Sequence, residues 1–329
     1  MKISSPAEIF SIADDSSFNH LALEIFRFQA TECKLYREYL NLLGVDPGRV
    51  SSVFSIPFMP ISFFRDHTVM TGDGPAEIIF QSSGTTGVRQ SSHHVKVLSL
   101  YDRSLEEGFR LFYGDPSGYA ITGLLPSYLE RKGSSLIYMV NRLMQLSGSD
   151  AGGFFIDDHS ALFHAVERAR EAGLQVLMIG VTYALLDLAE KYPRDLSDVI
   201  IMETGGMKGR RREMIREEVH DIIMNAFGVS TVHSEYGMTE LLSQAWSAGQ
   251  GLFSTPPWMK VLIRDSHDPM SRTAEAGAAG GISVIDLANL WSCSFIDTAD
   301  LGRIHPGGKF EVQGRFDAAD IRGCNLLVS

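Results

Sequence analysis

The sequence predicts an α/β protein with parallel or mixed sheets flanked by helices, followed by a small β-rich subdomain. Between residues 76 and 240, short apolar runs alternate with amphipathic helical patterns. Such alternation is typical of parallel sheets with helices on both faces. From about residue 251, glycine and proline become frequent and short β-like runs follow one another. That change indicates an antiparallel or barrel-like subdomain.

Residues 1–72 are predicted to form a helical N-terminal segment. In the stretch ending at Gly44, Leu35, Tyr39 and Leu43 recur at helical spacing. The glycine is suited to end that helix. The stretch IPFMPISFF follows, and its two prolines predict an extended connector.

Residues 73–250 are predicted to form the α/β core. Its expected strands lie at 76–81, 118–126, 152–157, 175–181, 196–206 and 229–240. Helical patterns separate several of them, the last with Ile215, Val219, Ile222 and Ala226 on one face. The β-rich subdomain then covers 251–313, and residues 314–329 form a final motif and tail.

Charge and composition exclude several classes of partner. The net charge is −11, and an acidic surface repels nucleic acid and anionic lipid. The chain has neither a signal-peptide apolar block nor a run of about 20 apolar residues that would span a bilayer. Its three cysteines, Cys33, Cys293 and Cys324, lack the spacing of a zinc site or disulfide framework. We therefore expect a cytoplasmic protein.

The segment FQSSGTTGVRQSS, from Phe80 to Ser92, follows an apolar strand. Glycine permits backbone angles that aim successive N–H groups inward, and hydroxyls add donors, so the loop is suited to wrap an anion. An ordinary connector between strands is the alternative. The segment does not fit the Walker A pattern and has no lysine; Arg89 is its only cation. Its small and hydroxyl residues are Ser82, Ser83, Gly84, Thr85, Thr86 and Gly87.

This loop resembles the phosphate loop of the adenylate-forming superfamily, which holds acyl-CoA synthetases, peptide-synthetase adenylation domains and firefly-type luciferases. The superfamily loop continues G-x-P-K-G, whereas Arg89 and Gln90 stand here at the proline and lysine positions. The resemblance implies that the loop grips the β- and γ-phosphates of ATP. Arg89 would then supply the missing charge one place early.

The segment YGMTE, residues 236–240, matches the superfamily pattern Y-G-x-T-E. The resemblance implies that Tyr236 stacks on adenine beside the Gly237 turn and that Thr239 donates to the α-phosphate. Glu240 would hold Mg²⁺ through a carboxylate oxygen, the kind of ligand this ion prefers. A plain strand-to-loop turn is the alternative.

Two further motifs follow in the superfamily order. DTADLGRI resembles T-G-D-x-G with Ala299 in the glycine position, which implies that Asp300 accepts hydrogen bonds from the ribose hydroxyls. GRFDAADIRG resembles G-R-x-D-x-x-I-K-x-x-G, which implies that Arg315 contacts the nucleotide and that Asp317 marks a hinge.

The segment METGGMKGRRREM, residues 202–214, precedes a helix. Gly205 and Gly206 would let the backbone approach adenine or the acyl group. Its basic residues lie at the helix start, where the helix dipole disfavours cations. They form either a solvated turn or a dock for a phosphate-bearing ligand or an acidic partner.

The chain ends soon after the hinge motif. Acyl-CoA ligases of the superfamily carry a further mobile domain with a catalytic lysine, and we expect that domain to be absent or vestigial here. The sequence most closely resembles the acyl-protein synthetase of the bacterial bioluminescence fatty-acid reductase complex. Those chains accept the acyl group on a cysteine near their C-terminus and pass it to a reductase subunit. Cys324 in IRGCNLLVS is the matching residue, with a packed small hydrophobe as its alternative role.

The expected function is therefore ATP- and Mg²⁺-dependent activation of a carboxylic acid, with a fatty acid favoured, to an acyl adenylate. Transfer to a thiol follows, with Cys324 as first acceptor and a reductase as onward partner. Thr239, Glu240 and Cys324 are the expected catalytic residues. One alternative is a ligase for CoA or a carrier protein that needs a separate C-terminal domain. The other is a non-catalytic nucleotide-binding relative.

Overall fold

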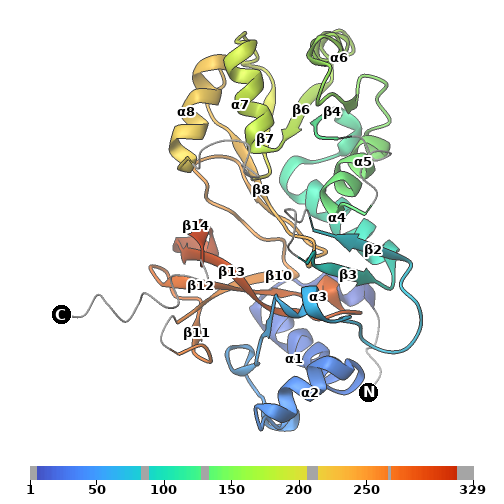
Figure 1. The fold of residues 1–329 in the computed structure, drawn as a ribbon, viewed down its shortest axis with the longest axis vertical. Coiled ribbons are helices and arrows are strands. Elements are labelled where there is room, and N and C mark those ends of the chain that lie inside the picture. Colours follow the sequence, from blue (N-terminus) through green and yellow to red (C-terminus); the bar gives the residue numbers. More distant parts are fainter. Residues whose placement is uncertain (1–5, 83–88, 127–132, 206–213, 266–267, 317–329) are drawn as a thin grey trace, which may run out of the picture. The chain divides into compact units, whose positions relative to one another are not determined.

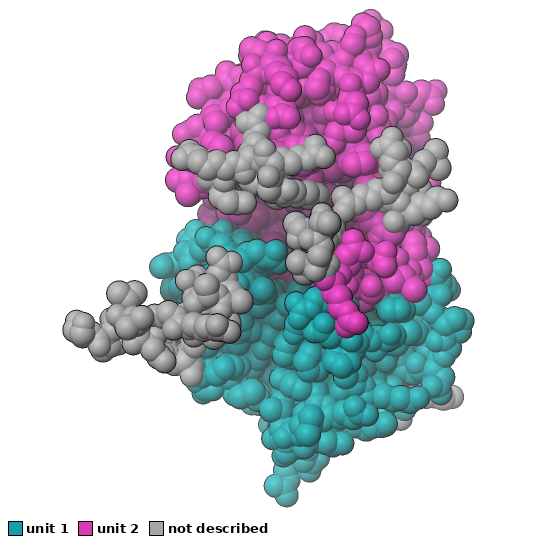
Figure 2. Space-filling view, in the orientation of Figure 1, with its two compact units in different colours: residues 1–77, 94–97, 257–329 teal, residues 78–93, 98–256 magenta. Residues whose placement is uncertain are grey.

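A computed structural model describes residues 6–82, 89–126, 133–205, 214–265 and 268–316. The chain divides into two compact units, which Figure 2 colours separately. Unit 1 comprises Met1–Glu77, His94–Val97 and Pro257–Ser329; unit 2 comprises Ile78–His93 and Leu98–Pro256. Among the helices described, none combines the length and apolar character needed to cross a bilayer.

Unit 2 is built on a six-stranded mixed sheet (Figure 1). Its spatial order is β5 (Gly153–Phe154), β4 (Tyr119–Leu124), β6 (Gln175–Gly180), β7 (Ile200–Glu203), β8 (His233–Tyr236) and β9 (Ala245–Ser247). The first five strands are parallel, and β8 pairs with β9 in the antiparallel sense. In β6, five consecutive residues are buried, as in strands covered on both faces.

Five helices accompany this sheet: α4 (Leu98–Tyr113), α5 (Ser135–Ser147), α6 (His159–Glu171), α7 (Thr182–Lys191) and α8 (Arg216–Phe227). Helices α5 and α6 pack against β4, and α7 packs against α8. The Ser134 hydroxyl caps the start of α5, and Gly148 ends it with φ +66°. A separate two-stranded sheet joins β2 (Ile78–Gln81) and β3 (Ser92–Val95).

Unit 1 contains a mainly antiparallel sheet in the order β1 (Met59–Pro60), β13 (Phe295–Ile304), β12 (Ala279–Asp286), β10 (Met259–Arg264) and β11 (Arg272–Thr273). Strand β14 (Phe310–Arg315) also pairs with β13, and β1 pairs with β13 in the parallel sense. Its helices are α1 (Asp15–Glu32), α2 (Lys34–Leu42) and α3 (Phe63–Asp66). Short 3₁₀ turns across both units lie at Pro6–Ser11, Pro47–Arg49, Val53–Ser55, Pro116–Gly118, Leu287–Asn289 and Pro306–Gly308.

The N-terminal segment contributes directly to the core of unit 1. The ring of Phe26 in α1 makes edge-to-face contacts with Tyr36 of α2 and with Phe295 of β13. The buried Gln29 amide nitrogen donates to the carbonyls of Asn289 and Leu290 at 3.0 Å. The helical segment and the β-rich segment therefore share one core.

Two predictions for residues 1–72 differ from the structure. In α2 the buried residues are Tyr36 and Leu40, whereas Leu43 is 42% exposed, because the face toward the core is offset by one residue from the predicted stripe. The connector IPFMPISFF forms a strand only at β1, and α3 begins within it at Phe63. Its second proline, Pro60, precedes α3 and does not interrupt it.

Candidate functional site

The YGMTE segment lies at the carboxyl end of β8, the edge at which open α/β sheets bind ligands. Tyr236 is only 8% exposed, and its ring centroid lies 5.9 Å from that of Phe253. A Cβ at Gly237 would lie 2.2 Å from Oε1 of Glu235, so glycine lets the chain pass this carboxyl. Glu240 is buried, with 5% of its surface exposed.

The base of the loop at 83–88 is fixed by two hydrogen bonds. The Ser82 N–H donates to the Ser91 carbonyl at 3.0 Å, and the Ser91 N–H donates to the Ser82 hydroxyl at 2.9 Å. Ser82 thus closes the loop, and its hydroxyl hydrogen is still able to donate. Arg89 is exposed beside this base. Ser83, Gly84, Thr85, Thr86 and Gly87 lie outside the described residues.

A buried histidine joins this loop base to the YGMTE segment. His93 follows the loop in β3 and is 1% exposed. Its Nδ1 lies 3.0 Å from the Thr239 carbonyl, which makes Nδ1 the donor. Two segments about 150 residues apart in sequence therefore meet at one point.

Glu203, the last residue of β7, is hydrogen-bonded to the start of α7, to the turn that follows β7 and to strand β8. Its Oε2 accepts hydrogen bonds from the Thr182 hydroxyl at 2.9 Å and from the Gly205 N–H at 3.1 Å. Its Oε1 accepts from the Ser234 hydroxyl of β8 at 3.1 Å. Gly205, with φ +73°, is thereby held where the predicted glycine turn begins. Its neighbour Gly206 lies outside the described residues.

The same carboxylate faces two basic side chains of α8. Nε of Arg216 and Nε2 of His220 each lie 3.8 Å from Oε1. Burial alone would raise the pKa of Glu203, but its interactions with His220, Arg216 and Thr182 outweigh burial and lower that pKa. Glu203 is therefore an ionised carboxylate in the interior.

Glu235, one residue before Tyr236, behaves in the opposite way. Desolvation and the nearby negative charge of Glu203 raise the pKa of Glu235 to about 8. It is consequently protonated at neutral pH. Two acids on neighbouring strands thus differ in charge because one has basic partners.

His233 opens β8 and packs beside an aromatic group. The hydroxyl of Tyr113 lies 3.1 Å from its Nδ1, and desolvation lowers the pKa of the imidazole. The side chain is therefore a neutral, hydrogen-bonded histidine at neutral pH.

In unit 1 the predicted ribose contacts lie side by side. Asp300 of β13 is in register with Arg315 of β14, and Nε of Arg315 donates to Oδ1 of Asp300 at 3.1 Å. The side chain of Arg315 is 74% exposed, whereas that of Asp300 is 12% exposed. Solvent screening makes the pair a weak contributor to stability. The arginine therefore lies at the surface, on a carboxylate that is itself mostly enclosed.

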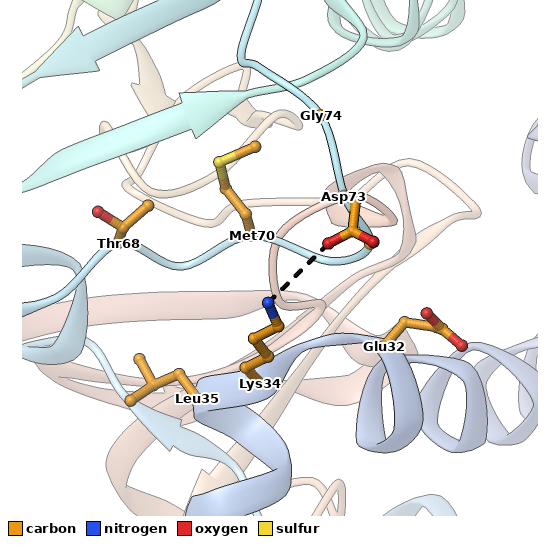
Figure 3. A pocket seen from close by; sticks show the side chains of 8 residues that line it. Glu32, Lys34, Leu35, Thr68, Met70, Asp73 and Gly74 are labelled. Carbon is orange, nitrogen blue, oxygen red and sulfur yellow. Dashed lines mark ion pairs between the residues drawn. The ribbon is translucent and has the colours of Figure 1, made fainter.

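A cavity of about 220 Å³ in unit 1 involves none of the predicted site residues (Figure 3). It is lined by Glu32, Lys34 and Leu35 of the α1–α2 region and by Thr68, Met70, Gly72, Asp73 and Gly74. Nζ of Lys34 lies 3.9 Å from the Asp73 carboxylate, with both side chains largely exposed. Such an exposed pair is weak, and we assign this cavity no role.

The structure reveals contacts that the motifs alone did not predict. Glu203, Thr182 and Ser234 were absent from the predicted site because their contact depends on which strands are neighbours. The available signal was a charged residue at the end of the apolar run DVIIME. Cys324 lies outside the described residues.

Glu240 is compatible with the predicted Mg²⁺ role. Within the described part of the chain, no group of three or more His, Cys, Asp or Glu side chains is arranged to hold a metal ion. Mg²⁺ in nucleotide sites commonly uses one or two carboxylates together with substrate phosphates, so one carboxylate fits this pattern.

No protein-family model and no curated protein matches the chain. Solved structures of ligases have a similar fold. A 2-hydroxyisobutyryl-CoA ligase in complex with 2-HIB-AMP and CoA gives a TM-score of 0.66 at 12% identity, covering 97% of this chain and 80% of that one. ATP-bound MatB from Rhodopseudomonas palustris gives 0.55 at 15% identity, covering 74% and 49%.

A long-chain-fatty-acid-CoA ligase, FadD1 from Archaeoglobus fulgidus, gives a TM-score of 0.51 at 15% identity, covering 72% of this chain and 51% of that one. The matched region therefore spans about half the length of MatB and of the archaeal ligase. These similarities confirm the predicted fold class, an α/β fold of the adenylate-forming type.

Proposed function

We propose that this protein activates a carboxylic acid with ATP, forming an acyl adenylate and pyrophosphate, and then transfers the acyl group to a thiol. The observation that supports it most is the bond between His93 and the Thr239 carbonyl. It brings the base of the predicted phosphate loop to the predicted α-phosphate contact. A fold shared with acyl-CoA ligases adds to this support.

In the first step, a carboxylate oxygen of the substrate forms a bond to the α-phosphorus of ATP. The bond from that phosphorus to the bridging oxygen breaks, and pyrophosphate leaves. Thr239 donates to the α-phosphate, and Glu240 would hold Mg²⁺, which offsets charge on the departing pyrophosphate. The step depends on positioning and electrostatics, without a protein nucleophile.

The other contacts to ATP follow from the motifs. Asp300 accepts from the ribose hydroxyls, with Arg315 beside it, and Tyr236 contacts adenine. The glycine turn at 205–206 admits adenine or the acyl group. The β- and γ-phosphates are assigned to the loop residues Ser82, Ser83, Gly84, Thr85, Thr86, Gly87 and Arg89.

In the second step, a thiolate attacks the acyl carbon, the bond to the phosphate oxygen breaks, and AMP leaves. We propose a fatty acid as substrate and Cys324 as the first acceptor, with a reductase subunit receiving the acyl group next. The solved complex of a 2-hydroxyisobutyryl-CoA ligase with CoA favours a second candidate acceptor, CoA itself.

Carboxylate-dependent exchange of labelled pyrophosphate into ATP tests the first step. A screen across fatty and aryl acids should reveal exchange with at least one acid, because adenylation is reversible. Glu240→Ala and Asp300→Ala should each lower the rate by about tenfold or more, while Glu171→Ala, at the exposed end of α6, should leave it unchanged. Nucleotide binding without exchange for any acid would instead indicate a non-catalytic relative.

The acceptor is tested by incubating protein, ATP and the active acid with and without CoA. If Cys324 accepts the acyl group, a hydroxylamine-labile acyl-protein forms, and Cys324→Ser abolishes it. Formation of acyl-CoA at an equal rate in Cys324→Ser would assign the acceptor role to CoA.

A further inference from the structure

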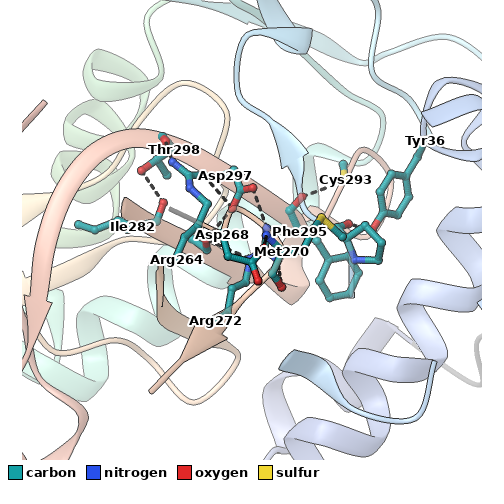
Figure 4. A network of polar contacts seen from close by, with 12 residues as sticks. Tyr36, Arg264, Asp268, Met270, Arg272, Ile282, Cys293, Phe295, Asp297 and Thr298 are labelled. Carbon is teal, nitrogen blue, oxygen red and sulfur yellow. Dashed lines mark hydrogen bonds and ion pairs between the residues drawn. The ribbon is translucent and has the colours of Figure 1, made fainter. Parts of the chain in front are cut away.

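Asp297 of β13 lies between Arg264 of β10 and Arg272 of β11, two strands on the far side of β12 in the sheet of unit 1 (Figure 4). Nη1 of Arg264 is 3.0 Å from its Oδ1, and Nη2 of Arg272 is 2.7 Å from its Oδ2. The Ser283 hydroxyl also donates to Oδ1, at 2.5 Å. Among the described residues, two guanidinium groups therefore meet this one carboxylate, and we call these residues the Asp297 cluster.

Arg272 satisfies its donors within the core. Its side chain is 1% exposed, Nε donates to the Ser283 hydroxyl, and Nη1 donates to the Met270 carbonyl. Its guanidinium lies 4.3 Å from the centre of the Phe58 ring. This arginine stabilises the sheet.

The Arg264 side chain extends across more strands of the sheet than that of Arg272. It starts on β10 and crosses β12 to β13, where Nη2 donates to the Thr298 carbonyl at 3.3 Å. Gly281 of β12 pairs with Arg264, and a Cβ there would lie 2.7 Å from that Nη2. The glycine therefore leaves the path for the guanidinium open.

Arg264 is connected to both members of the Asp300–Arg315 pair. The hydroxyl of Thr298 accepts from the Asp300 N–H at 3.1 Å, so the residue that Arg264 holds also fixes the backbone of Asp300. On the other side, the Phe316 ring lies 5.7 Å from the Arg264 guanidinium carbon. Phe316 directly follows Arg315, so Arg264 contacts both flanks of the pair.

We propose that Arg264 is a positioning residue that fixes Asp300 and Arg315 in the arrangement that receives the ribose of a nucleotide. The inference rests on the proposed function, which gives the pair its ligand. A carboxylate accepting hydrogen bonds from a diol needs a fixed orientation, and neighbouring contacts supply it. Arg264 acts through Thr298 and Phe316 and is not expected to contact the nucleotide.

The test compares ATP with 2′,3′-dideoxy-ATP, which lacks both ribose hydroxyls, by isothermal titration calorimetry on the full chain. A site that hydrogen-bonds a hydroxyl discriminates against a ligand lacking it, so the wild-type protein should prefer ATP. Arg264→Gln should weaken ATP binding by about tenfold, the loss of one charge-assisted hydrogen bond. Binding of the dideoxy analogue should change less than about twofold, because that ligand never used the pair.

General destabilisation of the protein would weaken the binding of both nucleotides alike and leave the ratio of their affinities unchanged. Arg264→Lys keeps the positive charge but loses the planar guanidinium with its two-pronged donors. We therefore expect an intermediate ratio of the affinities for ATP and 2′,3′-dideoxy-ATP. Arg303→Gln is the matched control, because Arg303 lies on the same sheet, is 46% exposed and, among the described residues, makes a loose 3.7 Å ion pair with Glu311. It should retain the wild-type ratio.

Thr298→Val provides a second variant if Arg264→Gln does not fold. It removes the hydroxyl that holds the Asp300 N–H and should cause the same selective loss. Wild-type ratios in the folded Arg264 and Thr298 variants would overturn the positioning role while leaving the proposed function intact. A wild-type protein that does not bind ATP would overturn the proposed function, and this inference with it.

Discussion

Glu203 is an ionised carboxylate buried among donors from the start of α7, the turn after β7, strand β8 and helix α8. We expect Glu203→Gln to lower the free energy of unfolding by about 3 kcal/mol, because it leaves the Arg216 guanidinium without its anionic partner. Urea denaturation measures the change. Glu167→Gln is the matched control, because Glu167 is 62% exposed in its pair with Arg170 and should contribute less than about 1 kcal/mol. If both variants lost the same small amount of unfolding free energy, the buried Glu203 carboxylate would not be a stabilising contact.

Glu235 predicts a pH dependence of stability. Its pKa is raised from 4.5 to about 8, so the folded chain keeps a proton that the unfolded chain releases. The folded state binds more protons between these values, so the free energy of unfolding falls as pH rises through that window.

Glu235→Gln mimics the neutral acid and should remove this contribution. The two proteins should match near pH 4, below the unfolded pKa, and the wild type should be less stable than the variant by a few kcal/mol above pH 8. Urea denaturation across this range, with the exposed-site variant Glu171→Gln as control, measures the difference. A constant difference between wild type and Glu235→Gln at all pH values would contradict the raised pKa.

At the scale of single residues, the residues inside the motifs could be predicted from the sequence, whereas the residues that hold the motifs in place could not. Asp300 and Arg315 could be named because they stand inside short recognisable patterns. Glu203 and Arg264 could not, because partners such as Thr182, Ser234 and Asp297 lie 21 or more positions away and are brought near only by the fold.

At the scale of elements, the end of α5 offers a clean test. Gly148 adopts φ +66°, and a Cβ added there would have no atom within 4 Å, so a side chain adds backbone strain without a clash. Gly148→Ala should destabilise the protein by about 1 kcal/mol. Gly118→Ala should have little effect, because that glycine also has open space but lacks a positive φ. Thermal denaturation compares the two, and equal midpoints would contradict the expected strain.

Whether a helix or strand could be predicted from the sequence depended on how regular its pattern of buried residues is. Strand β6 and helix α8 were recognised because a continuous apolar run and an amphipathic stripe are distinct patterns. Helix α4 was missed because Ser104 and Gly108 interrupt its buried face. Helix α7 was missed because seven of its ten residues are buried, which removes the alternation that marks a surface helix.

At the scale of the whole molecule, the order of the motifs predicted the fold class, and similar solved structures confirm it. The sharing of one unit by the two ends of the chain was not predictable from local patterns. Strand β1 has two residues, yet it pairs with Asp297 and its neighbour across more than 230 positions. Such a contact leaves no periodic trace in the sequence.

The central claim is that a substrate carboxylate attacks the α-phosphorus of ATP. The most direct measurement supplies the acid identified by the exchange screen with ¹⁸O in its carboxylate and examines the products by mass spectrometry after acyl transfer. Adenylation predicts one ¹⁸O atom in AMP, because the attacking oxygen stays on phosphorus when the thiol displaces it. If acyl transfer proceeds and the label appears in inorganic phosphate, or in neither AMP nor inorganic phosphate, the account is contradicted.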